Sequence, residues 1–424
     1  MTDLETRGAP RGGLLRRTAP ALLGYAAVRA LGLVLLAVWS AARGKSAYTL
    51  LTARWDALWY ARVAELGYGY EVRLPNGDVH SNLAFFPLLP WLERLLHALT
   101  PLSYADAGFA VGLVASLAAA WGIFAVADHV YGSRAGVCAV LLWAVLPVGI
   151  VQSMAYSESL FTALAAWSLY AVLTGRWPTA GVLAALAGLT RPVGLAVVAA
   201  IWAAGIASFV RDRRAAAAHG AQNEEHAPDA ASAARAPRIP RADGAPDSTR
   251  APSVAPGAPP WRRALGMLLA PLGAAAYVLW VGHRTGKGPL GYLDVQAGWR
   301  NGFDGGYAFA RFIADKFTSF PSALAGLGLI AGVCLVVWLY VTGVRQRQPL
   351  PLLVYTGVVT ALALGASSYF GSKPRLLLPA FPLLLPLALA LARLRTSRTV
   401  LVTTGVAVAS AVYGAFWLNG SGPP

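Results

Sequence analysis

Long apolar runs recur along the whole chain, and they constrain its fold more than any other feature. The first, residues 18–42, contains Arg29 as its single internal charge. A helix needs about 20 mainly apolar residues to cross a bilayer. Hydrophobic residues make up 57% of the chain and charged residues 13%, against roughly half and a quarter in soluble proteins. The sequence therefore predicts an all-α polytopic membrane protein.

The basic N-terminus resembles a signal sequence at first, because Arg7, Arg11, Arg16 and Arg17 precede the first apolar run. That run is too long for a typical signal peptide and lacks an obvious small-x-small cleavage site. We therefore expect it to be retained as the first span.

We assign eleven crossings to the membrane. The apolar runs that supply them are residues 18–42, 104–127, 135–151, 157–173, 178–210 as two crossings, 261–282, 321–343, 349–367, 376–394 and 399–418. The run 178–210 counts twice because one helix of that length would be about 50 Å long, against a core of about 30 Å. Pro192 breaks helices and disfavours helix at Arg191, so two short helices are predicted to meet there.

The distribution of basic residues predicts the orientation. With the N-terminus in the cytoplasm, eleven crossings leave the C-terminus outside and place more than half of the 35 Lys and Arg residues on the cytoplasmic side. A single crossing at 178–210 would send the Arg-rich segment 211–260 outside. The formal charge of +16 first suggests nucleic acid as a partner, but most basic residues flank apolar spans, so nucleic acid is not expected. Asp56, Glu158, Arg191 and Arg375 all fall on the non-cytoplasmic face.

Composition divides the chain into parts. We expect a cytoplasmic tail at 1–17, an N-terminal membrane module at 18–210 with an outer loop at 43–103, and a C-terminal membrane module at 261–424 with an outer loop at 284–320. Residues 211–260 are rich in Ala, Pro, Arg and acidic residues with almost no large apolar ones, which predicts a disordered cytoplasmic linker. Cys138 and Cys334 lie in apolar runs and favour no disulfide framework.

The first outer loop carries the most unusual segment, Arg54-Trp55-Asp56-Ala57-Leu58-Trp59-Tyr60. Apolar residues recur there at helical spacing, so interfacial helices are predicted in this loop, with Asp56 on a polar face. An acid among tryptophans beside a membrane loses hydration and is a candidate for chemistry. The alternative is an aromatic belt whose acid faces water.

Three further segments bring charge to the outer face. Glu158 follows Ser157 at the mouth of an apolar span, where Ser157 could simply cap the helix. Arg191 is a lone arginine that either points into an outer cavity or pairs with Asp56 or Glu158. Lys373 and Arg375 lie on a loop that is predicted to be outside, although basic residues usually concentrate in cytoplasmic loops. A phosphate ligand would explain their position.

Carboxylates and arginines at helix mouths suit transfer from a lipid phosphate, which needs a base for the acceptor hydroxyl and cations for the departing phosphate. The sequence has no Gly-rich phosphate loop and no His-Cys metal spacing. We predict no cofactor, and a divalent metal held by carboxylates alone stays open.

Four motifs in register resemble the PIG-V family of membrane mannosyltransferases: Arg54-Trp55-Asp56-Ala57, Asn82 to Pro87, Tyr156-Ser157-Glu158, and Arg191. The family belongs to the GT-C class, and residues 374–382 are similar to a late segment common in that class. The resemblance covers about the first half of the chain. It implies a GT-C-like bundle, a polyprenyl-phosphate sugar donor, usually of mannose, and a catalytic acid at Asp56.

The leading hypothesis is therefore an inverting glycosyltransferase with Asp56 as general base. Glu158 would support the base or bind the acceptor, and Arg191, Lys373 and Arg375 would hold the donor phosphate. The aromatic segment would pack the lipid or sugar, through Arg54, Trp55, Trp59 and Tyr60. The composition is typical of bacteria, so we expect a bacterial plasma membrane and a lipid- or glycan-type acceptor other than a GPI anchor. A transporter or flippase of a lipid-linked sugar, and a non-catalytic subunit, are the alternatives.

Overall fold

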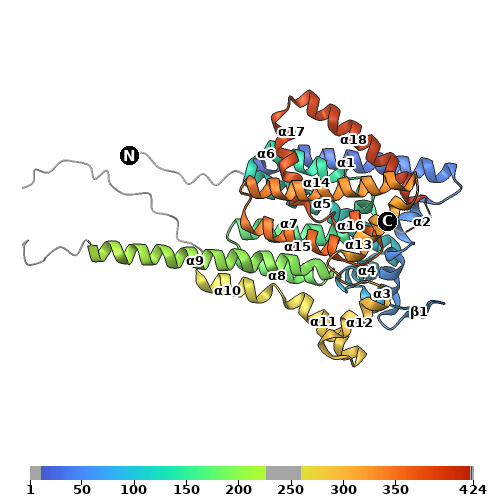
Figure 1. The fold of residues 1–424 in the computed structure, drawn as a ribbon, viewed down its shortest axis with the longest axis horizontal. Helices are drawn as coiled ribbons and strands as arrows, with labels where there is room; N and C mark the ends of the chain where they lie inside the picture. The colour runs from blue at the N-terminus through green and yellow to red at the C-terminus, as the bar shows by residue number, and fades with distance from the viewer. Residues whose placement is uncertain (1–10, 226–258, 421, 423–424) are drawn as a thin grey trace, which may run out of the picture.

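The structure, a computed structural model, describes residues 11–225, 259–420 and 422, and within these ranges it is a bundle of helices (Figure 1). The N-terminal module contains α1 (Arg11–Ala42), α5 (Tyr104–Tyr131), α6 (Ser133–Ala144), α7 (Ser157–Leu173), α8 (Trp177–Gly188) and α9 (Leu195–Glu225), with short 3-10 turns η2 (Gly149–Ser153) and η3 (Pro192–Gly194). The predicted helical class is confirmed.

The C-terminal module contains the remaining long helices. They are α10 (Pro260–Leu269), α11 (Leu272–Thr285), α14 (Ser322–Arg345), α15 (Leu350–Gly365), α16 (Lys373–Leu376), α17 (Leu385–Arg393) and α18 (Thr396–Leu418), with η7 (Phe370–Ser372) and η8 (Phe381–Leu384) around α16. Its outer loop holds η5 (Gly288–Leu290), α12 (Gly291–Gly298), α13 (Tyr307–Asp315) and η6 (Lys316–Thr318).

Six helices among the described residues are long and apolar enough to cross a membrane, and the bent pair Phe370–Leu376 and Phe381–Arg393 could make a seventh. The other four predicted crossings coincide with apolar helices of 10 to 17 residues, which are α6, α7, α8 and α15. The chain is thus a multi-pass helical protein by length and composition, and the count of eleven crossings stays a prediction. The ends of α1 and α18 meet, since Lys45 Nζ donates to the carbonyl of Asn419 at 2.6 Å. The two helices therefore run parallel, as an odd number of crossings requires.

Two boundaries differ from the sequence prediction. Helix α9 continues to Glu225, so it is not a short helix and the linker does not begin at residue 211. The alanines at 215–218 are strong helix formers, and they extend the helix beyond its apolar part. Residues 226–258, the rest of the predicted linker, lie outside the described residues.

The first outer loop folds into short elements at one end of the bundle (Figure 1). They are α2 (Ala47–Thr52), α3 (Asp56–Leu66), the antiparallel strands β1 (Glu71–Arg73) and β2 (Val79–Ser81), η1 (Asn82–Ala84) and α4 (Leu88–Leu99). A turn at Asn76 and Gly77 joins the two strands, and Gly77 adopts a φ of +88°. Such a turn residue favours glycine.

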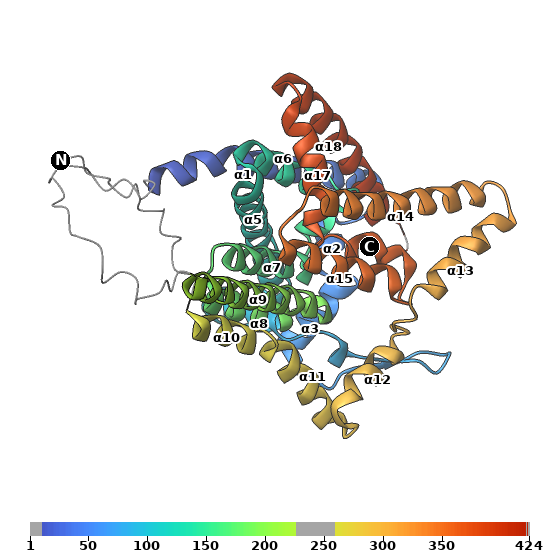
Figure 2. The same ribbon diagram turned by 60° about the vertical axis from the view of Figure 1, so that its left-hand side comes forward.

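The outer loop of the C-terminal module docks on this first loop. Trp299 donates its indole N–H to the carbonyl of Ser81 at 2.9 Å, and Arg300 forms an ion pair with Asp78 at 2.6 Å. Figure 2 shows α12 beside the hairpin, with α13 leading away toward α14. The two modules are thus joined at the end of the bundle that carries the first outer loop.

Candidate functional site

The first outer loop places Asp56 at the start of a helix. Trp55 directly before it has φ 51° and ψ −127°, a conformation that residues with side chains rarely adopt. The guanidinium of Arg54 lies 4.2 Å from the centroid of the Trp55 ring. The Asp56 side chain is 27% exposed, and its carboxylate lies 2.9 Å from Nη2 of Arg375.

Glu158 lies in the first turn of α7, and its side chain is 1% exposed. Its Oε1 is 2.5 Å from Nη1 of Arg191 and 3.1 Å from Nε of Arg375. The N-cap of this helix is Tyr156, not Ser157 as the capping alternative had it. The Ser157 hydroxyl instead shares a hydrogen bond of 2.7 Å with the Tyr60 hydroxyl and accepts one of 3.3 Å from Arg191.

Both arginines reach Glu158 from breaks between apolar helices. Arg191 has extended φ and ψ between α8 and η3, because Pro192 disfavours helix at the preceding residue. Arg375 lies in the single turn α16, at the end of the first of two segments, Phe370–Leu376 and Phe381–Arg393, that meet at a bend of 75°. The predicted break at Arg191 is confirmed, and each break turns a guanidinium into the end of the bundle.

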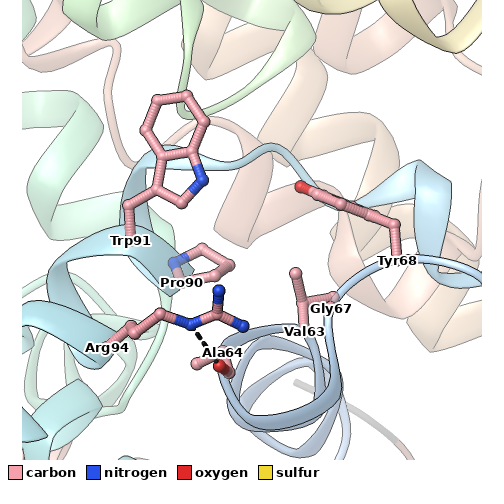
Figure 3. Close-up of a pocket in the computed structure, with 7 residues that line it drawn as sticks. All are labelled: Val63, Ala64, Gly67, Tyr68, Pro90, Trp91 and Arg94. Atoms are coloured by element: carbon pink, nitrogen blue, oxygen red, sulfur yellow. Dashed lines mark hydrogen bonds between the residues drawn. The ribbon is translucent and has the colours of Figure 1, made fainter.

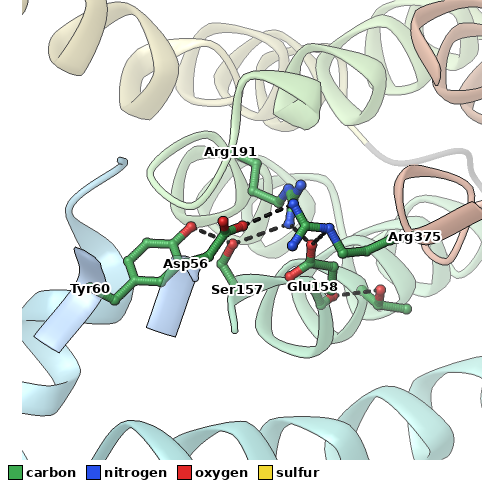
Figure 4. Close-up of polar contacts among 7 residues, drawn as sticks. Asp56, Tyr60, Ser157, Glu158, Arg191 and Arg375 are labelled. Atoms are coloured by element: carbon green, nitrogen blue, oxygen red, sulfur yellow. Dashed lines mark hydrogen bonds and ion pairs between the residues drawn. The ribbon is translucent and has the colours of Figure 1, made fainter. Parts of the chain in front are cut away.

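The four charged residues named from the sequence therefore meet in one cluster (Figure 4). Two carboxylates and two guanidinium groups face one another, and Arg375 touches both acids. Arg375 also lies over the Tyr156 ring, with 5.1 Å from its Cζ to the ring centroid. We call Asp56, Glu158, Arg191 and Arg375 the outer ion cluster.

Arg375 has donor capacity to spare within the outer ion cluster. Among the described residues, its Nε and Nη1 have no hydrogen-bond partner of good geometry, although Nε lies at ion-pair distance from Glu158. Its side chain is 10% exposed. Buried donors are nearly always paired, so this guanidinium is suited to a further anionic ligand.

Other residues predicted for the site lie elsewhere or act differently. Lys373 is buried, and its Nζ donates to the carbonyls of Ala363, Leu364 and Ala366 at the end of α15. None of these hydrogen bonds reaches the cluster. The reason is local: α15 ends with free carbonyls, which a nearby lysine satisfies.

The aromatic residues of the loop divide into two groups. Tyr60 is buried with its hydroxyl on Ser157, and burial raises its pKa. Trp59 stacks on Phe85 with 5.6 Å between ring centroids and meets Trp299 edge to face at 4.9 Å. Trp299, missed from the sequence, completes this aromatic group.

A small cavity lies within the first outer loop, between α3 and α4 (Figure 3). Its volume is about 60 Å³, and its lining residues are Val63, Ala64, Gly67, Tyr68, Pro90, Trp91 and Arg94. Arg94 donates through Nε to the carbonyl of Ala64 at 2.8 Å. None of the lining residues belongs to the outer ion cluster, so this cavity is separate from it.

Within residues 11–225 and 259–420, no group of three His, Cys, Asp or Glu side chains is arranged to hold a metal ion. The two carboxylates of the cluster are turned toward arginines.

One known family matches part of the chain. Residues 39–214 match the family described as mannosyltransferase (PIG-V). That range includes Asp56, Glu158 and Arg191, and it leaves out Arg375. The predicted resemblance is thereby confirmed over these residues. Among curated proteins, none matches the sequence.

Three solved structures resemble the fold. ArnT from Cupriavidus metallidurans bound to undecaprenyl phosphate matches with a TM-score of 0.50 and 15% identity, over 91% of this chain and 63% of that chain. Apo ArnT gives a TM-score of 0.46 and 14% identity, over 85% and 68%. The Archaeoglobus fulgidus oligosaccharyltransferase complex with Zn and sulfate gives 0.44 and 14%, over 94% and 53%.

The first of these likenesses shows a shared fold. The chain spans less than two thirds of the length of that ArnT.

Proposed function

We propose that this chain, which resembles the PIG-V mannosyltransferases over residues 39–214, is a membrane glycosyltransferase. It transfers a sugar, with mannose expected, from a polyprenyl-phosphate donor to an acceptor on the non-cytoplasmic face, with inversion at the anomeric carbon. The observation that carries the proposal is the outer ion cluster, where the accessible carboxylate of Asp56 pairs with Arg375 and the buried Glu158 pairs with both arginines.

Asp56 is the general base in this proposal. It is the more exposed of the two acids, at 27% against 1% for Glu158, so an acceptor hydroxyl can reach it. The hydroxyl oxygen attacks the anomeric carbon while its proton passes to Asp56. The bond from that carbon to the phosphate oxygen breaks on the opposite side of the sugar, which inverts the centre and releases polyprenyl phosphate.

The arginines stabilise the phosphate as it leaves. Charge that develops on the phosphate oxygens is best met by preorganised cations in a site with little water. Arg375 offers a planar fork whose Nη1 has no hydrogen-bond partner in the described part of the chain, and such a fork suits phosphate. Arg191 is held by Glu158 and Ser157 and adds a second positive charge.

The donor would reach the cluster from the bilayer. The chain has several helices of span length, and the ArnT whose fold it resembles was solved with undecaprenyl phosphate bound. In the proposed arrangement, the N-terminal module supplies Asp56, Glu158 and Arg191 and the C-terminal module supplies Arg375. The N-terminus is cytoplasmic and the C-terminus outside, in a bacterial plasma membrane.

Transfer is tested in membranes with labelled polyprenyl-phosphate mannose and a lipid extract, with products read by mass spectrometry. The wild-type chain should make a new glycosidic product, and Asp56→Asn should lower the rate by roughly 10² to 10⁴, the range for loss of a general base. Asp78→Asn is the matched control, because Asp78 is an acid of the same loop that is paired with an exposed arginine outside the cluster.

Undiminished transfer by Asp56→Asn would show that Asp56 is not the base. If the labelled lipid changes leaflet and no product forms with any extract, the chain is a transporter. The Asp78→Asn control should keep the wild-type rate, since exposed ion pairs contribute about 0 to 1 kcal/mol.

A further inference from the structure

The ion pair between Asp56 and Arg375 occupies two groups that the reaction needs free. The Asp56 carboxylate must accept a proton, and Arg375 must hold a phosphate, yet the two lie 2.9 Å apart. We infer that the donor phosphate displaces Asp56 from Arg375, so that binding of the donor releases the base. This inference rests on the proposed function and adds the order of events at the same site.

The two acids of the cluster differ in how firmly they are held. Glu158 is 1% exposed and contacts both arginines, at 2.5 and 3.1 Å. Asp56 is 27% exposed and has an ion pair with Arg375 alone. Partly exposed pairs are weak, whereas removing one partner from a buried pair is strongly destabilising. Asp56 is therefore the acid that an incoming anion replaces.

Arg375 can exchange partners without moving far. Its Nε faces Glu158 and its Cζ lies over the Tyr156 ring, so the guanidinium plane stays anchored while Nη2 changes partner. Nη1 has no hydrogen-bond partner among the described residues. A phosphate can thus take Nη1 and Nη2 together, in the bidentate manner typical of arginine.

Electrostatic repulsion determines which group moves when the donor binds. The four side chains of the outer ion cluster sum to zero, with two acids and two arginines. A sugar phosphodiester adds one negative charge, and like charges within a few ångströms repel. The mobile carboxylate therefore moves away from the phosphate, toward the more exposed side. When Asp56 takes the acceptor proton, its negative charge is lost and one appears on the departing phosphate, beside the two arginines.

This order of events predicts ordered binding. Until the donor binds, Asp56 is occupied by Arg375 and cannot accept a proton from the acceptor. After the donor binds, the carboxylate is free and can receive the acceptor hydroxyl. Arg375 thus couples binding of the donor phosphate to release of the Asp56 carboxylate.

The experiment measures binding of undecaprenyl phosphate, without a sugar, to the purified full chain in nanodiscs. Asp56→Asn removes the competitor for Arg375, so the variant should bind the lipid about tenfold more tightly than wild type while transferring sugar roughly 10² to 10⁴ times more slowly. Glu158→Gln makes the same change in net charge but unseats both arginines, so it should bind the lipid no more tightly than wild type. Asp78→Asn should leave the affinity unchanged.

The outcomes separate the two proposals. If Asp56→Asn binds the lipid as weakly as wild type or more weakly, while wild type transfers sugar, the exchange is wrong and the proposed function stands. If Asp56→Asn and Glu158→Gln gain the same affinity for the lipid, the gain comes from the change in net charge. That result also overturns the exchange. If wild type neither binds the lipid nor forms a glycosidic product, the proposed function fails. Asp56→Ala repeats the first comparison should Asp56→Asn fold poorly.

Discussion

Two buried glutamates near the first outer loop have the same burial and opposite surroundings. Glu158 begins α7, and Glu93 lies in α4 where that helix packs on α5; each is 1% exposed. Two guanidinium groups converge on Glu158. No ion pair to Glu93 is found among the described residues, and its Oε2 has no hydrogen-bond partner there.

Glu93 is packed rather than paired. A Cβ added at Gly108 would lie 2.5 Å from its Oε1 and 3.3 Å from the Cβ of Ala155. Burial raises the pKa of Glu93 well above its usual value, so this carboxyl stays protonated and neutral to a higher pH than an exposed glutamate does. The comparison teaches that burial alone does not mark a reactive site. What distinguishes Glu158 from Glu93 is the convergence of opposite charges from separate elements.

The largest effect is expected from Glu158→Gln, which removes the acid that both arginines share. Loss of one partner from a buried ion pair costs about 3 to 5 kcal/mol, because the remaining charge stays buried and unpaired. Thermal unfolding in detergent should show a clear fall in Tm, together with loss of transfer.

A double variant sharpens this test. Arg191→Met added to Glu158→Gln removes one of the unpaired charges, so it should recover part of the lost stability, and the four proteins together give the coupling energy. A Glu158→Gln protein as stable as wild type would mean that the arginines do not depend on this acid.

A smaller effect of a different kind is expected from Glu93→Gln. The folded pKa of Glu93 is raised, so its contribution to stability is full below the unfolded pKa of about 4.3 and is lost as pH rises through the folded value. Glutamine does not ionise. The variant should therefore match wild type near pH 4 and exceed it at alkaline pH, by on the order of 1 kcal/mol.

The measurement is Tm against pH for both proteins. If Tm depends on pH in the same way in wild type and in Glu93→Gln, ionisation of Glu93 does not affect stability. The two buried glutamates would then not differ through the charge of Glu93. Asp78→Asn serves again as the control, since its carboxylate is paired outside the cluster.

Much of the fold followed from local sequence signals. The break at Arg191-Pro192 and the helix over Trp59 and Val63 were predicted from proline chemistry and apolar spacing, and both are present. The hairpin and its docking on Trp299 were not predicted. Strands of three residues carry too little pattern to read, and the docking joins residues more than 200 positions apart.

The charges of the candidate site were predicted, and pairing of Arg191 with Glu158 was among the alternatives and is present. The position of Arg375 between both acids was not predicted. Asp56, Glu158, Arg191 and Arg375 were each conspicuous as charges at the ends of apolar runs. Lys373 was conspicuous for the same reason, yet it caps α15. Sequence cannot distinguish these roles, because both need a cation beside a helix end and only the folded chain shows which acceptor is near. The burial of Glu93 was not predicted, because an acid in a segment that mixes polar and apolar residues is usually exposed.

The smallest effect is expected from Tyr60→Phe, which tests whether neutral hydrogen bonds support the Glu158 side of the comparison. The substitution removes the 2.7 Å hydrogen bond between Tyr60 and Ser157 and leaves the ring in place. Ser157 Oγ still accepts from Arg191 at 3.3 Å, so the loss should be about 0.5 to 1.5 kcal/mol. We expect a slightly lower Tm and an unchanged KM for the donor. If KM instead rises about tenfold at constant Tm, Tyr60 contacts substrate as the sequence suggested, and hydrogen bonding to Ser157 is secondary. Because Tyr60 is buried, the packing favours a slightly lower Tm with an unchanged KM. That result would mean that the arginines stabilise the Glu158 carboxylate and that the Tyr60 hydroxyl contributes little.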